Sequence, residues 1–481
     1  MMYLPPMSRA YGTAVLLLMA VTPPMAAAQD LSALADEVET ELREGLLRTW
    51  YPRVLDEEHG GYLSTFDYQW QPQGDQDKFI VTQARHLWMT SKAADFYPGE
   101  RDRYLAMAAS GVAQLRDVMW DREYGGFFDL VTRDGQVKKE SDGRIVKRAY
   151  GQSFAIYGLA AYYAASKDTA ALRLAQEAFH WLEEHSHDPV HGGYFQFLDR
   201  DGTPFPDGYA GTPPKDQNSS IHLLEAFTEL YHVWPDPLLR ERLNEMLILV
   251  RDTMTHEKGY LRLFFQQDWT PVSYRDSSEV VRQANYRTDH VSFGHDIETA
   301  YLMLEASEAL GLELDTTTLR IAKKMVDHSL DHGWDMARGG LYDEGYYFPG
   351  SDAVSIIKDT KTWWAQAEAL NSLLLMAELF PGEAWRYYGH FLQLWNYTKT
   401  YLIDAEYGGW YGGGLDKQPE FRTGLKAHIW KAAYHDGRTL MNLTRRLRTA
   451  VSERRQFFQP AGTTHYTTRI SSFRPPGGRY T

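Results

Sequence analysis

Residues 121–127 read Asp-Arg-Glu-Tyr-Gly-Gly-Phe, and this pattern of an aspartate, three further residues and a Gly-Gly pair before a large apolar residue recurs along the chain. Its second glycines stand at positions 61, 126, 193, 340 and 409, and a degenerate copy, Lys258-Gly259-Tyr260, stands between the third and the fourth of these. With Gly259 included, the copies are 65 to 69 residues apart, except for one interval of 81. Six copies at a nearly constant period indicate one repeat architecture and not several separate domains.

Helical stretches with apolar residues at three- and four-residue spacing lie on both sides of these copies. Amphipathic stretches precede the Gly-Gly pairs, over 31–50, 104–119, 170–185 and 238–254. More apolar stretches follow them, over 82–96, 152–165, 219–233, 295–310, 362–379 and 427–447. Outer amphipathic helices alternating with inner buried ones predict an all-α fold, an (α/α)6 barrel of six helical hairpins with short β-hairpins at one rim. In these hairpins glycine would supply the positive φ of the turns.

Composition and charge exclude several classes of protein. The 481 residues include 50 Lys and Arg against 64 Asp and Glu, which gives a formal net charge of −14, and they include no Cys. An acidic balance of this size argues against a nucleic-acid partner. Without Cys there are no disulfides, iron–sulfur clusters or thiolate zinc sites. Aromatic residues make up 14% of the chain, which suits either a large core or a protein that stacks on sugar rings.

The first residues have the pattern of an export signal. Arg9 precedes an apolar run over 14–21 and a small-residue site that ends at Ala28. Because the run is too short to span a bilayer, it predicts a signal peptide over 1–28 with cleavage after Ala28. We therefore expect a periplasmic or secreted protein with no membrane contact after cleavage. The barrel domain is expected over 29–450, and 451–481 is expected to be a disordered tail because it lacks periodicity.

Candidate site residues stand at the starts of the six inner helices, because every rim loop comes just before one of them. Asn218 and His222 are four residues apart, and His295 and Glu298 are three apart, so each pair shares a helical face. A carboxylate beside an imidazole fixes its tautomer, so Glu298 is predicted to orient His295. The other candidates at these starts are Arg85, Tyr150, Trp363, Trp364, Trp430 and His435.

This set of side chains suits proton removal beside the carbonyl of a sugar. Histidine has the right pKa for the transfer, and an arginine can stabilise the enediolate that forms. Return of the proton to the opposite face of carbon 2 is epimerisation, and return to carbon 1 is isomerisation. The chemistry needs no cofactor. A metal site is less favoured, because neither His-x3-His spacing nor a second acidic cluster stands at the helix starts.

The sequence resembles the N-acylglucosamine 2-epimerase superfamily, and most closely its cellobiose 2-epimerase branch. The resemblance rests on four segments, 218–226, 292–298, 363–368 and 430–438, which read Asn-Ser-Ser-Ile-His-Leu-Leu-Glu-Ala, Ser-Phe-Gly-His-Asp-Ile-Glu, Trp-Trp-Ala-Gln-Ala-Glu and Trp-Lys-Ala-Ala-Tyr-His-Asp-Gly-Arg.

The resemblance implies a role for each candidate residue. His295 and His435 would be the acid/base pair at carbon 2 of the reducing-end aldose of a β-1,4-linked disaccharide. His222 would assist ring opening or hold the sugar hydroxyls, and Arg85 would face the oxyanion. The remaining contacts with the sugar would come from Trp363 or Trp364, Trp430, Tyr150 and Asn218.

Other functions stay open at this stage. An aldose–ketose isomerase or an N-acylglucosamine 2-epimerase would share the inner ring of residues. A glycoside hydrolase of the same barrel class would need two carboxylates flanking the bond, and a periplasmic sugar-binding protein would need only the aromatic and arginine contacts. A monomer and a homodimer are both compatible with the sequence.

Overall fold

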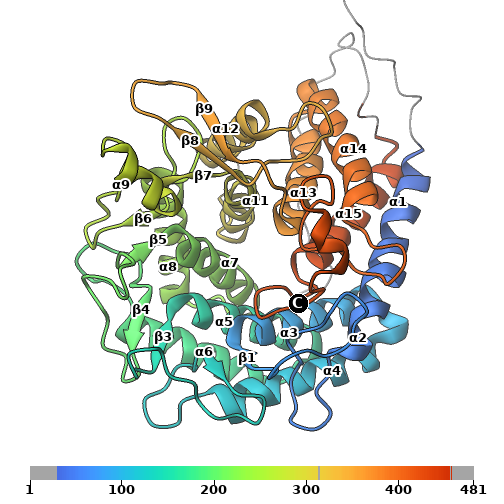
Figure 1. Ribbon diagram of the computed structural model, residues 1–481. Coiled ribbons are helices and arrows are strands. Elements are labelled where there is room, and N and C mark those ends of the chain that lie inside the picture. The colour runs from blue at the N-terminus through green and yellow to red at the C-terminus, as the bar shows by residue number, and fades with distance from the viewer. Residues whose placement is uncertain (1–29, 313–314, 456, 458–481) are drawn as a thin grey trace, which may run out of the picture.

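The computed structural model of the chain describes residues 30–312, 315–455 and 457. Six inner helices stand in a ring in which neighbours along the chain pack side by side (Figure 1). They are α3 (Ile80–Phe96), α5 (Ala149–Ser166), α7 (Gln217–Val233), α11 (Phe293–Ala309), α13 (Trp363–Leu379) and α15 (His435–Ser452). The predicted (α/α)6 barrel is therefore confirmed. The predicted signal peptide and the predicted tail beyond 457 lie outside the described residues and stay predictions.

Outer helices cover the inner ring (Figure 1). They are α1 (Leu31–Thr40) with η1 (Glu41–Leu47) and α2 (Arg48–Arg53), α4 (Arg101–Ala113) with η3 (Gln114–Met119), α6 (Thr169–His185), α8 (Pro237–Ile248) with η4 (Leu249–Met254), α12 (Thr316–Gly333), and α14 (Ala384–Tyr401). Aspartates cap four of these helices, because Asp30, Asp168, Asp236 and Asp315 each accept a backbone N–H of the first turn. The segments η1, η3 and η4 are π-helical.

Short elements fill the connections. They are η2 (Pro98–Glu100), α9 (Glu279–Ala284), α10 (Tyr286–Asp289), η5 (Pro381–Glu383) and η6 (Pro419–Thr423). Both α9 and α10 lie in the one long interval of the repeat. Among the described residues, no helix is both long enough and apolar enough to span a lipid bilayer.

Small antiparallel sheets stand at the loop end of the barrel and join each repeat to the next. The strands are β1 (Lys78–Phe79), β2 (Leu130–Val131), β3 (Val146–Arg148), β4 (Phe197–Asp199), β5 (Lys215–Asp216), β6 (Phe264–Phe265), β7 (Val291–Ser292), β8 (Glu344–Tyr347) and β9 (Val354–Lys358). They pair as β1–β2, β3–β4, β5–β6 and β7–β8–β9. Except for the β8–β9 hairpin, each strand pair joins the strand before one inner helix to a strand of the following repeat. The predicted short hairpins are present at the Gly-Gly turns, where a single antiparallel bridge closes each of them, for example Trp120 with Phe127 and His187 with Tyr194.

A buried Asp–Lys ion pair holds five of the Gly-Gly turns. In the third copy, Lys215 Nζ lies 2.8 Å from Asp188 and also donates to the carbonyl of Gly192 at 2.8 Å. The same arrangement joins Lys78 to Asp56, Lys147 to Asp121, Lys361 to Asp335 and Lys426 to Asp404. Both glycines of these turns have positive φ, for example 72° and 68° at Gly192 and Gly193, which favours glycine.

The fourth copy of the turn departs from this pattern. His256 stands in place of the aspartate, and Val291 stands in place of the lysine two residues before the inner helix. An antiparallel β-bridge between Thr255 and Leu261 closes this turn. It corresponds to the β-bridge between Trp120 and Phe127 in the second copy. Leu261, and not Tyr260, is therefore the counterpart of Phe127, and this turn is one residue shorter than the others.

The last inner helix begins later than predicted. The apolar spacing suggested a helix from position 427, but α15 begins at His435 and residues 427–434 form a loop. The loop is fixed from two sides: Lys431 Nζ donates to the carbonyl of Trp410 at 2.5 Å, and Thr82 Oγ1 donates to the carbonyl of Ile429. Loop residues that bury their side chains in this way imitate the apolar spacing of a helix.

Candidate active site

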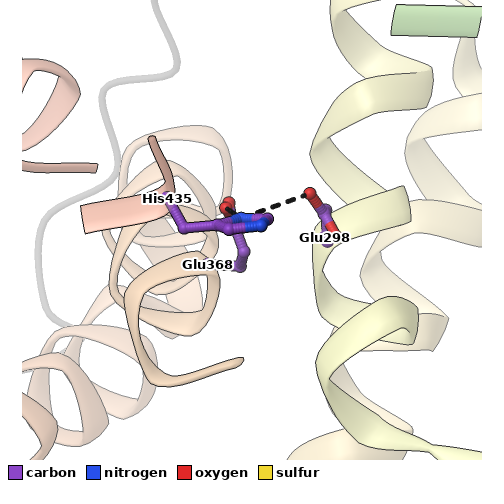
Figure 2. Close-up of side chains that lie close together, drawn as sticks. All are labelled: Glu298, Glu368 and His435. Atoms are coloured by element: carbon purple, nitrogen blue, oxygen red, sulfur yellow. Dashed lines mark hydrogen bonds and ion pairs between the residues drawn. The ribbon is translucent and has the colours of Figure 1, made fainter. Parts of the chain in front are cut away.

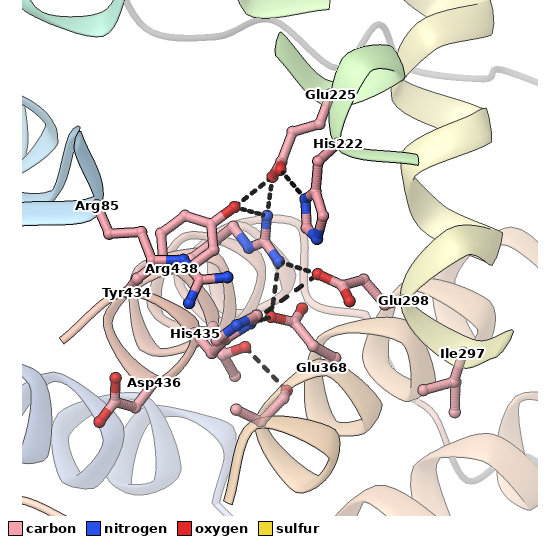
Figure 3. A network of polar contacts seen from close by, with 12 residues as sticks. Arg85, His222, Glu225, Ile297, Glu298, Glu368, Tyr434, His435, Asp436 and Arg438 are labelled. Atoms are coloured by element: carbon pink, nitrogen blue, oxygen red, sulfur yellow. Dashed lines mark hydrogen bonds and ion pairs between the residues drawn. The ribbon is translucent and has the colours of Figure 1, made fainter. Parts of the chain in front are cut away.

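Arg438 lies at the centre of the candidate site, on the first turn of α15 (Figure 3). Its guanidinium donates to Glu225 of α7, to Glu298 of α11 at 2.8 Å and to Glu368 of α13 at 2.6 Å. All four side chains are buried. One arginine thereby joins four inner helices and places one positive charge beside three buried glutamates, which water cannot reach.

His222 is oriented by a carboxylate on its own helix. Its Nδ1 lies 2.9 Å from Glu225, which also accepts the hydroxyl of Tyr434 at 2.5 Å. Burial alone would raise the pKa of Glu225, but Arg438 and His222 outweigh burial and lower this pKa to about 2. Since Glu225 is then a carboxylate, His222 donates through Nδ1 and keeps a lone pair on Nε2. Burial also lowers the pKa of His222, so the ring is neutral.

His435 has the same arrangement with a carboxylate from the neighbouring helix. Its Nδ1 lies 2.5 Å from Glu368, whose other oxygen accepts the hydroxyl of Tyr301 at 2.7 Å. Arg438 and Tyr301 both donate to Glu368, so this glutamate acts as an acceptor. Nδ1 of His435 is then a third donor to it and carries the hydrogen, which leaves the free lone pair on Nε2. Burial, together with Arg85 and Arg438, holds the pKa of His435 well below its ordinary value.

His295 has a different partner from the one predicted. Its Nδ1 lies 2.8 Å from Ser292 Oγ, at the end of β7, whereas Glu298 accepts from Arg438 and lies 3.9 Å from Nδ1 of His435. The prediction that Glu298 orients His295 is therefore wrong: the two residues share a helical face, but Arg438 offers the stronger donor. Burial and the other imidazoles lower the pKa of His295 to about 3.

The structure places Arg85 between a loop and a neighbouring helix. Its Nη1 donates to the carbonyl of Trp430 at 3.0 Å, and its Nη2 donates to the hydroxyl of Tyr150 at 3.1 Å. The guanidinium lies 4.5 Å from the ring centroid of Phe154. Tyr150 in turn lies edge-on to His222, at 5.3 Å between centroids. Arg85 thus positions the loop that carries Trp430 and brings positive charge close to the histidines.

Only one indole of the tandem pair faces the histidines. Trp364 is half-buried, and its ring lies 4.7 Å from that of His295 and 5.7 Å from that of His435. Trp363 points the other way, edge-on to His428, and is buried. A helix turns by about 100° per residue, which separates the two rings.

Two further predicted residues lie where solvent can reach them. Trp430 is 48% exposed and packs edge-on against Phe79. Asn218, on the first turn of α7, is half-buried, and among the described residues its Oδ1 has no hydrogen-bond partner. Trp430 is therefore available to a ligand at the loop end of the barrel, whereas the unpartnered Oδ1 of Asn218 is itself buried.

Sequence reasoning missed the residues that orient the histidines. They are Glu225, Ser292, Glu368, Tyr434 and Arg438. Ser292 and Glu225 could have been found, because each stands three residues from a histidine, the spacing that was applied to His295 and Glu298. Glu368 lies on a different helix from His435, and only the ring closure brings them together.

An acidic cluster is present at the centre, contrary to the prediction. Ligand atoms of Glu298, Glu368 and His435 lie within 4.8 Å of one another (Figure 2). Burial and the neighbouring Glu368 raise the pKa of Glu298. However, Nη2 of Arg438 donates to both glutamates, so a positive charge already occupies the position that a metal ion would take. The donor set is therefore better suited to holding a guanidinium than a divalent cation.

Comparison with known proteins gives consistent matches over most of the chain. A family model described as N-acylglucosamine 2-epimerase (GlcNAc 2-epimerase) matches residues 60–436. The cellobiose 2-epimerase of Bacteroides fragilis is 28% identical over 426 residues, which covers 85% of this chain and 98% of that protein. The solved structure of cellobiose 2-epimerase from Spirochaeta thermophila has a TM-score of 0.74 and 30% identity, with 88% of this chain and 98% of that one covered. The structure of cellobiose 2-epimerase from Bacillus thermoamylovorans also has a TM-score of 0.74, with 25% identity, over 86% of this chain and 100% of that one.

Proposed function

The chain belongs to the N-acylglucosamine 2-epimerase family, and from that premise we propose that it inverts carbon 2 of the reducing-end aldose of a β-1,4-linked disaccharide. Cellobiose would become the glucosyl-mannose disaccharide. The names of the relatives support this substrate, and the loop end of the barrel offers indoles for two sugar rings at Trp364 and Trp430. The reaction requires no cofactor.

In the proposed mechanism, His295 and His435 act from opposite sides of carbon 2. One neutral imidazole removes the proton, and the other, in its protonated form, returns a proton to the opposite face. The two histidines exchange roles in the reverse reaction. Because their pKa values are lowered, both imidazoles are neutral in the free protein, so one of them must take up a proton from solvent or from the sugar when the substrate binds. That imidazolium then gives its proton up readily to carbon.

Charge in the intermediate would be balanced by groups already in place. Removal of the carbon 2 proton leaves an enediolate, and the positive charge of Arg85 lies close enough to lower the pKa of both His222 and His435. His222, with its free Nε2, would accept a proton from the sugar hydroxyl when the ring opens. Asn218, one helical turn earlier, would hold a neighbouring hydroxyl.

The observation that carries this proposal is that carboxylates fix the tautomers of two imidazoles within one ring of helices. A sugar-binding protein does not need this arrangement. A glycoside hydrolase would need two carboxylates free to act on the bond. Here Glu225, Glu298 and Glu368 are all bonded to Arg438, which favours the epimerase.

Incubation with cellobiose in deuterated water tests the proposal. We expect deuterium at carbon 2 and a new epimer by sugar chromatography, and we expect both signals to disappear in His295→Ala and His435→Ala. His191→Ala, an exposed histidine in a Gly-Gly turn, is the matched control and should keep full activity. Lactose, mannobiose, glucose, mannose and N-acetylmannosamine complete the panel of substrates. A ketose product would favour the isomerase, and glucose release that survives in His295→Ala would show a hydrolase.

A further inference from the structure

A shallow, open pocket of about 550 Å³ lies away from the histidines of the candidate active site. We call it the rim pocket; it lies between α12, the β8–β9 hairpin and the fourth Gly-Gly turn. Its lining consists of Glu257, Lys258, Lys324, His328, His332, Tyr347 and Asp352. A cavity of this volume lies within the range of small-molecule sites.

The rim pocket occurs where the chain departs from its own repeat. Five copies of the turn hold a buried Asp–Lys pair, but the fourth has His256 and Val291 at these positions. Tyr260 takes the place of a glycine, and its ring packs 5.2 Å from Tyr347 and 5.5 Å from His328. The five other copies have aspartate and glycine at the positions of His256 and Tyr260, so the barrel itself does not require an imidazole and a phenol at these two positions.

Cationic groups in the rim pocket lack strong partners. Among the described residues, Lys324 Nζ and the ring nitrogens of His332 have no hydrogen bond or ion pair. Lys258 Nζ lies 4.4 Å from the ring centroid of Tyr347 and 2.9 Å from Asp352. Because the Asp352 side chain is fully exposed, water competes with that ion pair and Lys258 is easily released.

A buried nitrogen also lacks a partner. The His328 side chain is only 5% exposed; its Nε2 lies 2.9 Å from the Tyr347 hydroxyl, while its Nδ1 has no partner in the described part of the chain. A buried polar atom without a partner costs about 1–3 kcal/mol. A ligand in the rim pocket that forms a hydrogen bond with Nδ1 of His328 would remove this cost.

The unpaired cations favour an anion over a metal ion. Two carboxylates, Glu257 and Asp352, offset the two lysines in formal charge, but Lys324 has no partner among the described residues, and Arg275, outside the lining, lies 5.5 Å from the same Tyr347 ring. His328 and His332 are four residues apart, a spacing that would also suit a transition-metal ion. However, Lys258 and Lys324 would repel a metal ion from the same cavity.

We propose that the rim pocket binds a phosphate dianion, either free or as the monoester of a small sugar. Lys258 and Lys324 would supply the charge, and His332 and His328 would supply N–H donors. The cavity is larger than phosphate needs, so a sugar phosphate should bind more tightly than inorganic phosphate. The site is separate from the candidate active site and does not depend on the proposed epimerase activity.

Calorimetric titration of the whole protein at constant ionic strength tests this proposal, with inorganic phosphate, glucose 6-phosphate and glucose as separate ligands. We expect both phosphates to bind and glucose to give no signal. Lys258→Met and Lys324→Met should each raise the Kd by about tenfold. Asp352→Asn should lower the Kd, because it removes the competitor for Lys258, and a damaged fold could not produce that gain.

Lys139→Met serves as the matched control, since Lys139 is exposed and lies in a distant loop. Its Kd should equal that of the wild type. Glucose 6-phosphate that binds through the active site would be displaced by cellobiose and would not respond to Lys324→Met. The proposal is overturned if phosphate does not bind, if both lysine variants bind as the wild type does, or if glucose binds as well as its phosphate.

Discussion

At the scale of single residues, Glu368 fixes which nitrogen of His435 can accept a proton. We expect Glu368→Gln to lower kcat by about a hundredfold or more, because the amide can donate to Nδ1 and so favours the wrong tautomer. The remaining amide oxygen can still accept the hydroxyl of Tyr301, and Glu225 and Glu298 still pair with Arg438, so the fold should persist. Deuterium exchange at carbon 2 of cellobiose measures the effect.

Glu378→Gln is the control for this substitution. Glu378 lies at the far end of the same helix and pairs with Arg446. We expect its kcat to stay close to that of the wild type. Equal kcat values for Glu368→Gln and the wild type would contradict the assigned orientation of His435.

Glu41 is a half-buried residue with a largely enclosed carboxylate, and the candidate site does not use it. It accepts Nε1–H of Trp410 at 3.0 Å, and burial raises its pKa to about 7 although this hydrogen bond opposes the shift. The folded state therefore keeps a proton that the unfolded state loses above about pH 4.5. Stability falls as pH rises from that value to about 7.

Glu41→Gln should remove this loss. We expect its Tm to exceed that of the wild type by a few degrees at pH 8 and to match it near pH 4.5, because the amide is neutral throughout and still accepts from Trp410. Thermal unfolding at several pH values measures the difference. Glu44→Gln, at an exposed site one turn away, should show no such dependence of Tm on pH. A Tm gain for Glu41→Gln that is the same at every pH would contradict a raised pKa for Glu41.

The three histidines could be predicted from sequence because each lies within the first two turns of an inner helix, next to a rim loop. Their orienting partners could be predicted only in part. The spacing of three residues holds for both His222–Glu225 and His295–Glu298, yet only the first pair is bonded. Arg438 decides the difference, since it draws Glu298 away from His295, and a helical spacing carries no information about a competing donor on another helix.

At the scale of elements, the Gly-Gly turns depend on the buried Asp–Lys pairs. The third copy is the clearest test, because Asp56 and Asp121 have arginine partners as well, whereas Asp188 is paired with Lys215 alone among the described residues. Lys215→Met should leave Asp188 buried without a cation and destabilise the fold by about 3–5 kcal/mol.

Addition of Asp188→Asn to Lys215→Met should recover much of this loss. The amide carries no charge, and its oxygen can still accept the backbone N–H groups of Val190 and His191. Chemical denaturation of the wild type, the two single variants and the double variant measures the coupling. A double variant less stable than Lys215→Met would contradict a role for the ion pair in holding the turn.

The helices themselves were largely predictable, since five inner helices begin within three residues of their predicted starts. The exception is the last, where the loop 427–434 buries Ala427 and 431–434 and contacts both the first and the sixth repeat. The π-helical segments could not be predicted, because one extra residue in a turn changes the hydrogen bonds and leaves the apolar spacing almost unchanged.

At the scale of the whole molecule, the first and last repeats must meet to close the ring. Phe66 donates its backbone N–H to Ala427, Gly409 donates to Gly45, and Trp410 reaches Glu41. Outside the ring, Arg448 pairs with Asp36 and Glu39. Closure brings α15 beside α3 and α13, and thereby carries Arg438 to carboxylates from three other helices.

Arg438→Met should therefore destabilise the whole barrel and not one repeat. Three buried glutamates would lose their cation, at a cost of at least 3–5 kcal/mol, so we expect a large fall in Tm at pH 8. Without the guanidinium, burial raises the pKa of these glutamates above the value of about 4.5 in the unfolded chain, so stability falls as pH rises and the deficit should be smaller at pH 5. Arg438→Lys keeps one positive charge, but its ammonium cannot reach three carboxylates. Its Tm should therefore lie between that of the wild type and that of Arg438→Met. Thermal unfolding at pH 5 and pH 8 measures these differences. If only Arg438→Met has a lower Tm, and if this loss is the same at both pH values, then the packing of Arg438 and not its charge stabilises the barrel.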